Sequence, residues 1–345
     1  MKIIGIETSC DETAVAIVEN GRKVLCNIIA SQIDLHKITG GVVPEIAARE
    51  HALKIIPVLE QALNEAKLKL EDIDAIAVTR GPGLLSSLII GYSAATTLAM
   101  VLNKPIIPVH HVSGHIYANW LDTEDDFDFP IMCLTVSGGH NELVLLNKNF
   151  EFVLIGETLD DAAGEAFDKI ARLLGLSYPG GPAISKRALN GNAKAIKFPR
   201  ALMKKDNFNF SFSGLKTAVL LAIEEEFKNA GKLSDKFIDD CCASFQEAVC
   251  EVLIHKLLSA AKKFHVKEVH LAGGVSANTR LREMLQNKIQ NDAVLKNIKF
   301  RYTANKVYCT DNAAMIAGAA YFQQQSNQYS SLTNLKPDPQ LSLYE

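Results

Sequence analysis

Residues 2–19 read KIIGIETSCDETAVAIVE. Two apolar runs rich in Ile and Val flank the polar turn Ser9-Cys10-Asp11-Glu12, and β-branched runs joined by a tight polar turn are typical of paired strands. The arrangement returns at residues 131–147, where IMCLTV and NELVLLN flank the turn Ser137-Gly138-Gly139-His140. Two similar units about 130 residues apart predict a duplicated fold.

Further strands are expected after each copy and between them. They fall at residues 23–29, 74–79, 106–109, 151–155 and 267–272. Alternation of such strands with helical segments predicts an α/β protein with two open sheets, in which ligands bind where strand ends meet helix N-termini. We therefore expect a ligand cleft at the junction of two lobes.

Helical periodicity marks residues 43–67, and long helices are also expected at about 84–102, 160–174, 213–228, 235–264 and 311–325. The apolar face of the first helix is interpreted as Ile46, Leu53, Ile56, Leu59 and Leu63.

The length of 345 residues predicts two lobes rather than one core. We assign residues 1–108 plus 311–330 to an N-terminal lobe and residues 109–310 to a C-terminal lobe. Residues 331–345 are interpreted as a polar, loosely held tail.

The composition excludes several classes of protein. A net charge of -3 gives no overall attraction for nucleic acid, so such a partner requires a local basic patch. Seven cysteines, an odd number scattered along the chain, indicate thiols in a reducing cytosol, and the absence of Cys-x-x-Cys spacing disfavours a thiolate zinc site. No secretory leader is found, and the apolar run Leu84 to Leu102 is interpreted as a buried helix because serines and threonines interrupt it. We expect a cytoplasmic protein with no membrane partner.

Three polar or glycine-rich turns follow apolar strands. They are Glu7 to Glu12, Val136 to His140 and Ala272 to Asn278. Backbone N–H groups of such turns can hold a phosphate, and glycine lets the ligand approach closely. One Gly-Gly turn alone is usually just a tight turn. Three of them predict an adenine-nucleotide site, although the GxxxxGK[ST] motif of a P-loop is absent.

A histidine pair indicates a metal site. His111 and His115 stand four residues apart, on one face of an expected helix, and Asp311 is a candidate third ligand. Two histidines and one carboxylate leave coordination positions open for substrate. The alternative is a purely structural histidine pair. The residue after His111 is Val112, so the HExxH motif of zinc proteases is missing.

Residues 169–205 carry nine basic side chains and no acid. A solvated surface is the ordinary interpretation of such a run, and a surface that contacts the phosphates of a nucleic acid is the sharper one. The basic residues are Lys169, Arg172, Lys186, Arg187, Lys194, Lys197, Arg200, Lys204 and Lys205.

Taken together, these motifs resemble the TsaD family of tRNA-modifying enzymes over nearly the whole chain. The matching stretches are Gly5–Thr13, Gly40–His51, Val109–His115, Val136–His140, Gly164–Lys169, Tyr178–Pro182, Phe210–Thr217, Gly273–Arg280 and Cys309–Asn312. The family is similar to actin, heat-shock chaperones and sugar kinases, which implies the two-lobed duplicated fold. It also implies transfer of a threonylcarbamoyl group from threonylcarbamoyl-adenylate to the exocyclic amine of the adenosine 3′ of the anticodon, in tRNAs that read codons beginning with A.

The resemblance further implies roles for individual residues. Asp11 and Glu12 are the acidic pair near the reacting centre. One divalent ion, iron or zinc, is held by His111, His115 and Asp311. The adenylate-type ligand (the threonylcarbamoyl-adenylate, ATP or AMP) is contacted by Thr135, Val136, Ser137, Gly138, Gly139, Asp168, Gly181 and Asn278.

One position departs from the pattern of archaeal and eukaryotic relatives. They tend to have an acid where this chain has Ser185, so the corresponding ribose contact is not carried over and the chain resembles bacterial members. The resemblance then implies four partners: tRNA, a TsaB-like paralogue, a TsaE-like ATPase and an enzyme that supplies the adenylate.

Two other functions are weighed against this one. A metalloprotease is disfavoured by Val112, and a nucleotide-binding scaffold without catalysis is disfavoured by the acidic pair Asp11 and Glu12.

Overall fold

The computed structural model describes residues 1–39, 41–203, 207–326 and 336–344. The chain divides into two compact units. Unit 1 comprises residues 1–127, 148–152 and 303–345, and unit 2 comprises residues 128–147 and 153–302. The boundary expected at residue 108 therefore lies after Phe127, and the segment that carries His111 and His115 belongs to unit 1. The return to unit 1 comes at Thr303 rather than at Asp311.

Unit 1 is built on a five-stranded sheet with the order β3-β2-β1-β4-β5. Its central strand β1 pairs antiparallel with β2 and parallel with β4, and β5 continues the parallel half. The strands are β1 (Lys2–Glu7), β2 (Glu12–Glu19), β3 (Lys23–Ser31), β4 (Ala75–Gly81) and β5 (Ile106–His110). The buried runs of Ile, Val and Ala in β1, β2 and β4 explain why these strands lie at the centre of the sheet.

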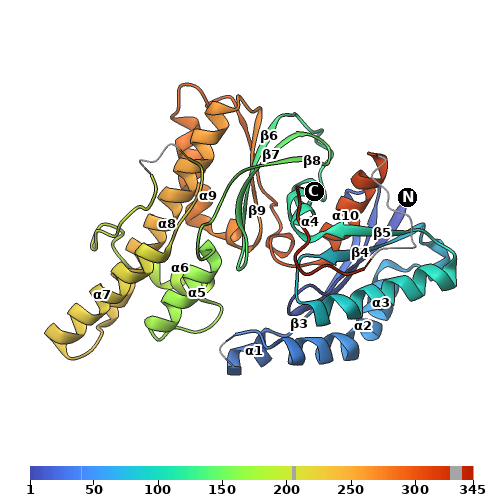
Figure 1. The fold of residues 1–345 in the computed structure, drawn as a ribbon, viewed down its shortest axis with the longest axis horizontal. Helices are drawn as coiled ribbons and strands as arrows, with labels where there is room; N and C mark the ends of the chain where they lie inside the picture. The colour runs from blue at the N-terminus through green and yellow to red at the C-terminus, as the bar shows by residue number, and fades with distance from the viewer. Residues whose placement is uncertain (40, 204–206, 327–335, 345) are drawn as a thin grey trace. The chain divides into compact units, whose positions relative to one another are not determined.

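The α-helices in the described part of unit 1 are α1 (Ile33–Thr39), α2 (Pro44–Ala66), α3 (Leu85–Leu102), α4 (His111–Tyr117) and α10 (Ala313–Gln325). Helix α10 comes from near the end of the chain but packs on β1 and β2 at its beginning (Figure 1). Gly5 in β1 permits this contact, because a Cβ there would lie 2.4 Å from the carbonyl oxygen of Ala313.

The sequence prediction of the buried face of α2 is wrong in part. Leu59 is buried, but Ile46, Leu53 and Ile56 are exposed. The buried face consists of Ala47, His51, Ile55, Val58, Leu59 and Ala62. The buried face contains two alanines and a histidine, which contribute little to an apolar pattern. The larger apolar residues of the neighbouring face therefore dominated the sequence prediction.

Helix α3 is apolar and long enough to cross a membrane by length and composition. In the structure it connects β4 to β5 and packs against β4 and α2. Its buried positions are Ser87, Leu88, Gly91, Ala95 and Ala99, whereas Met100 and Val101 are exposed. The expectation of a buried helix is therefore correct for one face only.

Unit 2 repeats the topology of unit 1. Its sheet has the order β10-β9-β6-β7-β8, in which β6 pairs antiparallel with β7 and parallel with β9. The strands are β6 (Ile131–Val136), β7 (Asn141–Lys148), β8 (Glu151–Glu157), β9 (Glu268–Ala272) and β10 (Lys299–Arg301). Position for position, this order matches β5-β4-β1-β2-β3, so the duplication predicted from the two strand–turn–strand units is confirmed.

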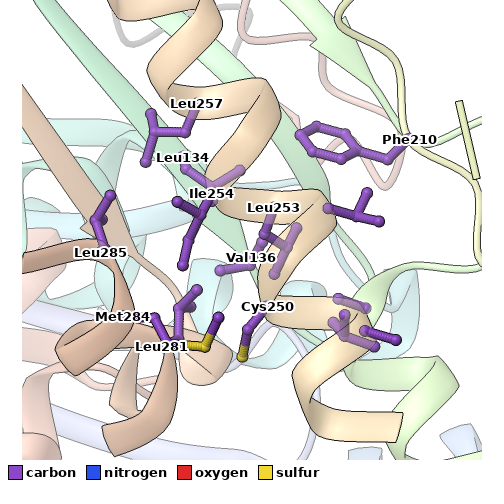
Figure 2. Packing of buried hydrophobic residues seen from close by; sticks show 14 of the residues in the cluster. Leu134, Val136, Phe210, Cys250, Leu253, Ile254, Leu257, Leu281, Met284 and Leu285 are labelled. Carbon is purple, nitrogen blue, oxygen red and sulfur yellow. The ribbon is translucent and has the colours of Figure 1, made fainter. Parts of the chain in front are cut away.

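The core of unit 2 forms where helices cover this sheet. Figure 2 shows Leu134 and Val136 of β6 beside Leu253, Ile254 and Leu257 of α8, with residues of α9 on another side. The helices of the unit are α5 (Ala163–Leu173), α6 (Gly180–Ala188), α7 (Ser213–Ala230), α8 (Asp235–Lys263) and α9 (Thr279–Gln290). Helix α6 and strand β10 were not expected from the sequence, because both are short and have weak patterns.

The end of the chain also differs from expectation. Residues 331–335 lie outside the described residues, but residues 336–344 are held against β4. The amide of Asp338 donates to the carbonyl of Arg80 at 2.8 Å, and the amide of Gly83 donates to the carbonyl of Pro339 at 3.3 Å. This part of the tail is therefore not loosely held.

Candidate metal centre and ligand-binding turns

The last residue of β1 organises the centre of unit 1. Glu7 is fully buried, and its carboxylate accepts hydrogen bonds from the amide of Ser9 at 2.5 Å and the hydroxyl of Thr79 at 2.5 Å. Nδ1 of His111 lies 3.1 Å from the same carboxylate. Burial alone would raise the pKa of Glu7, but the charge and hydrogen bond of His111 hold that pKa below its ordinary value. Glu7 therefore fixes the orientation of the His111 ring, in the way that carboxylates orient histidines at metal sites.

The predicted metal ligands converge. Nε2 of His111 and Nε2 of His115 lie 3.5 Å and 3.2 Å from the same oxygen of Asp311, and the two imidazole rings are nearly perpendicular. One ligand atom from each residue falls within 4.8 Å of the others. Ligands bound about 2.0–2.1 Å from a tetrahedral ion stand roughly 3.3 Å apart, so this spacing fits one ion.

Burial and hydrogen bonding at the three ligands also fit a metal. His115 is buried, and apart from the 3.2 Å contact of Nε2 with Asp311, neither of its ring nitrogens has a hydrogen-bond partner within the described part of the chain. Burial lowers the pKa of His111, but the carboxylates of Asp311 and Glu7 outweigh it and raise that pKa to about 9. The group therefore attracts positive charge, as a proton or as a metal ion. Two imidazoles and one carboxylate suit zinc or iron.

The acidic pair Asp11 and Glu12 lies in the electrostatic field of this centre. Burial raises the pKa of Glu12 to about 10, with further contributions from the charges of Asp311 and Asp11. The hydroxyl of Ser31 donates to Glu12 at 3.1 Å. His51 of α2 fixes the turn from the other side, since its Nδ1 accepts from the Thr13 hydroxyl at 2.8 Å and its Nε2 donates to the Cys10 carbonyl at 3.0 Å.

In unit 2, the turn after β6 is held by its own serine. The amides of Gly139 and His140 donate to Oγ of Ser137 at 3.3 Å and 3.0 Å. Thr135 and Val136, the preceding residues of β6, are buried, so the exposed part of this predicted ligand site is Gly138 and Gly139.

Glycines bring three segments of unit 2 together. A Cβ on Gly164 would lie 2.5 Å from the carbonyl oxygen of Ser137, and one on Gly273 would lie 2.5 Å from that of Val136. Gly273 also has a φ of +83°, which side chains other than glycine rarely adopt. In contrast, a Cβ on Gly138, Gly139 or Gly181 would meet nothing within 4 Å.

Asp168 joins α5 to the start of α6. Its carboxylate accepts the amide of Gly180 at 2.7 Å, and burial raises its pKa. Gly180 packs directly on α5, because a Cβ there would lie 2.6 Å from the Cα of Asp168. This contact places the half-buried Gly181 in the first turn of α6. The amide of Gly180 is taken by Asp168 and Pro182 has no N–H, so the amide of Gly181 is the one in these three residues that could face an anion.

Both polar atoms of the Asn278 side chain form hydrogen bonds within the protein. Its Oδ1 caps α9 by accepting the amide of Leu281 at 3.0 Å, and its Nδ2 donates to Ser185 at 3.1 Å and to Gln246 at 2.9 Å. Ser185 in turn donates to Gln246 at 2.8 Å. Any contact of this amide with a ligand would replace one of these bonds, and Gln246 is a member of the cluster that the sequence gave no reason to select.

In the structure, acidic side chains from outside or beside the basic segment (residues 169–205) neutralise part of its positive charge. Lys169 pairs with Asp161 and Glu165, Arg187 with Asp235 and Asp239, and Arg200 with Glu251. Lys186, Lys194 and Lys197 are exposed. Lys204 and Lys205 lie outside the described residues.

With this geometry established, comparison with known proteins is informative. The TsaD family, described as tRNA N6-adenosine threonylcarbamoyltransferase, matches residues 23–318. Proteins given that name from Thermomicrobium roseum and Bacillus subtilis are 51% and 50% identical to this chain, over 94% and 92% of it and 92% and 89% of their own lengths. A relative of the same name from Kosmotoga olearia is 49% identical over 98% of both chains. The chain belongs to the TsaD family. It is a transferase that acts in tRNA modification.

Solved structures show the fold of this TsaD family member. T. kodakarensis HypF aligns with a TM-score of 0.61 and 15% identity, over 94% of this chain and 48% of HypF. An activator of 2-hydroxyisocaproyl-CoA dehydratase from Clostridium difficile aligns with a TM-score of 0.53 and 16% identity, over 97% of this chain and all of the activator. The fold is therefore the duplicated actin-like fold predicted from the sequence.

Two residues of this TsaD centre escaped the sequence analysis. Glu7 and His51 fell within stretches that match the family, but neither was assigned a role, although both are fully buried and hydrogen-bonded. A charged or polar residue directly after or within an apolar run is the signal that could have identified them, because burial of such a group requires a partner.

The role of Glu7 gives the first prediction. We expect Glu7→Gln to weaken metal binding by about 10–100-fold, the usual effect of losing a carboxylate that orients a histidine ligand. His115→Ala should abolish binding, because it removes a ligand. Zinc titration monitored by a competing chelator measures both, with thermal unfolding to confirm folding.

Glu19→Gln is the matched control, since Glu19 ends β2 at the surface and pairs with exposed Lys23. Wild-type affinity in a folded Glu7→Gln protein would contradict the orienting role. Full metal content in His115→Ala would contradict the ligand assignment.

Proposed function

We propose that this chain transfers a threonylcarbamoyl group from threonylcarbamoyl-adenylate to the exocyclic amine of the adenosine 3′ of the anticodon, in tRNAs that read codons beginning with A. Membership of the TsaD family supports the reaction class. The observation that carries the proposal is the convergence of His111, His115 and Asp311 beside the buried Glu7. A cytoplasmic location is part of the proposal.

The reaction needs positioning more than strong nucleophiles. The exocyclic nitrogen of adenosine attacks the carbamoyl carbon, the bond from that carbon to the phosphate oxygen breaks, and AMP leaves. The nitrogen loses one proton in the process. Because an aromatic amine is a weak nucleophile, holding it against the carbamoyl carbon supplies much of the rate. In this proposal the turns of unit 2 hold the adenylate through backbone amides.

Asp11 is proposed as the proton acceptor. Glu12 retains its own proton at neutral pH, because burial and the charges of Asp311 and Asp11 raise its pKa to about 10. A protonated carboxyl group cannot accept the proton of the amine, so Glu12 is assigned to donate a hydrogen bond instead. A divalent ion bound by His111, His115 and Asp311 would supply positive charge to stabilise an oxyanion.

A protease reaction is disfavoured by the same geometry. Proteases of the HExxH type use a glutamate next to the first histidine to activate water, and here that residue is the buried Val112. Glu7 approaches His111 but is fully buried and already accepts two other hydrogen bonds. It holds the ligand rather than a water molecule.

Partners are also part of the proposal. We assign the chain a TsaB-like paralogue, a TsaE-like ATPase and an enzyme that makes the adenylate, on the bacterial resemblance of the sequence. The test is to add each purified component in turn and to measure whether modification of tRNA depends on it.

The central experiment incubates the full chain with tRNA, threonine, bicarbonate, ATP and these candidate partners, followed by mass analysis of the nucleosides. We expect a threonylcarbamoyl adenosine in the wild type. Asp11→Asn should slow its formation by about 10²–10⁴-fold, the typical contribution of a general base.

Asp34→Asn, a change of an exposed acid on α1, serves as the matched control. If Asp11→Asn retains the wild-type rate, Asp11 is not the acceptor. If the wild type modifies no tRNA with all partners present, the proposed reaction is wrong.

A second prediction concerns the nucleotide. Gly139→Val and Gly181→Val should weaken binding of ATP or AMP, because the new side chain would occupy space that faces no protein atom within 4 Å. The melting temperature should stay near the wild-type value for the same reason. Calorimetric titration and thermal unfolding measure the two effects.

Ala230→Val adds the same kind of bulk at the exposed end of α7 and should change neither quantity. Unchanged nucleotide affinity in both glycine variants would place the nucleotide elsewhere.

A third prediction concerns tRNA. We propose that residues 169–205 contribute phosphate contacts. Lys169, Arg187 and Arg200 are set aside because they form ion pairs, and the test uses three exposed lysines of the segment, Lys186, Lys194 and Lys197. Changing these three to alanine should weaken tRNA binding and reduce the log–log salt slope by about 0.7 for each lost contact. Arg200 stays unchanged, since its pairing with Glu251 at 2.6 Å gives it a structural role.

The matched control changes three other exposed lysines of unit 2, namely Lys228, Lys232 and Lys288. If both triple variants behave like the wild type, the segment is an ordinary solvated surface and tRNA binds elsewhere.

A further inference from the structure

His110 precedes the metal ligands but is not one of them. Its Nδ1 accepts the amide of Val112 at 3.1 Å and thereby caps α4, the helix that carries both histidine ligands. Its Nε2 lies 3.0 Å from the carbonyl oxygen of Leu341, near the end of the chain. Because an amide can only donate and a carbonyl can only accept, the ring carries its proton on Nε2. The two bonds define both the tautomer and the orientation of the ring.

The segment that supplies this carbonyl, residues 336–344, is called the C-terminal strap here. Nε of Arg80 donates to the carbonyl of Lys336 at 3.2 Å, and the amide of Asp338 returns a bond to the carbonyl of Arg80 at 2.8 Å. A Cβ on the neighbouring Gly81 would lie 1.8 Å from the carbonyl oxygen of Asp338. Residue 81 must therefore be glycine for the strap to lie against the end of β4.

A second path leads from the strap to the same ligand. The amide of Gly83 donates to the carbonyl of Pro339 at 3.3 Å. Gly83 packs on Ser9, since a Cβ there would lie 2.6 Å from the Ser9 carbonyl oxygen. Oγ of Ser9 lies 3.2 Å from Nδ1 of His111. The strap is thus connected to His111 by two routes, one through the ring of His110 and the other through Gly83 and Ser9.

We propose that the C-terminal strap is part of the metal centre, and that it acts through His110 as a positioning residue. Helix α4 has seven residues, which is too few to be stable alone, so its orientation depends on what holds its ends. At its N-terminus these contacts are the His110 cap and the bond from the Ser113 hydroxyl to the His110 carbonyl at 2.7 Å. Fixing the His110 ring to Leu341 fixes the direction in which His111 and His115 leave the helix.

The inference rests on the metal site of the proposed function, and its test distinguishes a failure of the positioning role from a failure of the metal assignment. The probe is Co²⁺ alone, whose visible spectrum reports ligand geometry and whose titration gives affinity. The variants are a chain ending at residue 335, His110→Asn, and Gln340→Ala as a control on the exposed part of the strap. Asparagine can still cap α4 but cannot reach Leu341.

We expect the shortened chain and His110→Asn to bind Co²⁺ about tenfold more weakly, the lower range for residues that support a ligand. Their cobalt spectra should be altered, and the amides of residues 112–117 should exchange faster. Adding the peptide of residues 336–345 should restore the shortened chain but not His110→Asn. Gln340→Ala should match the wild type.

Folded variants with wild-type cobalt affinity, spectrum and amide exchange would overturn the inference, whatever their melting temperature. If the shortened chain does not fold, His110→Asn decides the question. If the wild type binds no Co²⁺, the metal assignment is wrong, and the exchange rates of α4 still establish or refute the positioning role.

Discussion

The buried carboxylate of Glu7 is the interaction on which unit 1 depends. A charge removed from water is costly unless it is paired and hydrogen-bonded, and Glu7 meets both conditions with Ser9, Thr79 and His111. These partners come from the turn after β1, from β4 and from α4. One side chain therefore joins the central strand, its parallel neighbour and the helix that carries the candidate metal ligands His111 and His115. Removal of any partner would leave the carboxylate underbonded, so the site and the local fold are stabilised together.

The sequence was sufficient where local patterns repeat. The two strand–turn–strand units predicted the duplication, and the spacing of His111 and His115 predicted their common face. Both rest on short-range geometry that does not depend on the rest of the chain. Asp311 could be selected only as a candidate, because it is 196 residues from His115 in sequence and reaches it through the packing of α10 on β1.

Other features could not be predicted because they depend on contacts between distant segments. The face of α2 was misjudged, since burial of His51 depends on two distant partners, Cys10 in the turn after β1 and Thr13 in β2. The basic segment contains no acid in sequence, yet Asp235, Asp239 and Glu251 of α8 pair with two of its arginines, Arg187 and Arg200. Likewise, the polar composition of the tail gave no indication that residues 336–344 lie against β4, because hydrogen bonds between distant parts of the chain, made to the backbone of the tail, help to hold them there.

Glycines illustrate how structure adds meaning to a motif. In sequence, Gly139, Gly164, Gly181 and Gly273 are equivalent members of glycine-containing motifs. In space they separate into two groups, because Gly164 and Gly273 touch the backbone of Ser137 and Val136 while Gly139 and Gly181 face no protein atom within 4 Å of a Cβ. The first group is required for packing. In the second group, glycine costs conformational entropy on folding but permits no closer packing of the protein. Glycine is expected at such positions where a ligand must approach the backbone closely. The open glycines are therefore the stronger argument for a ligand site.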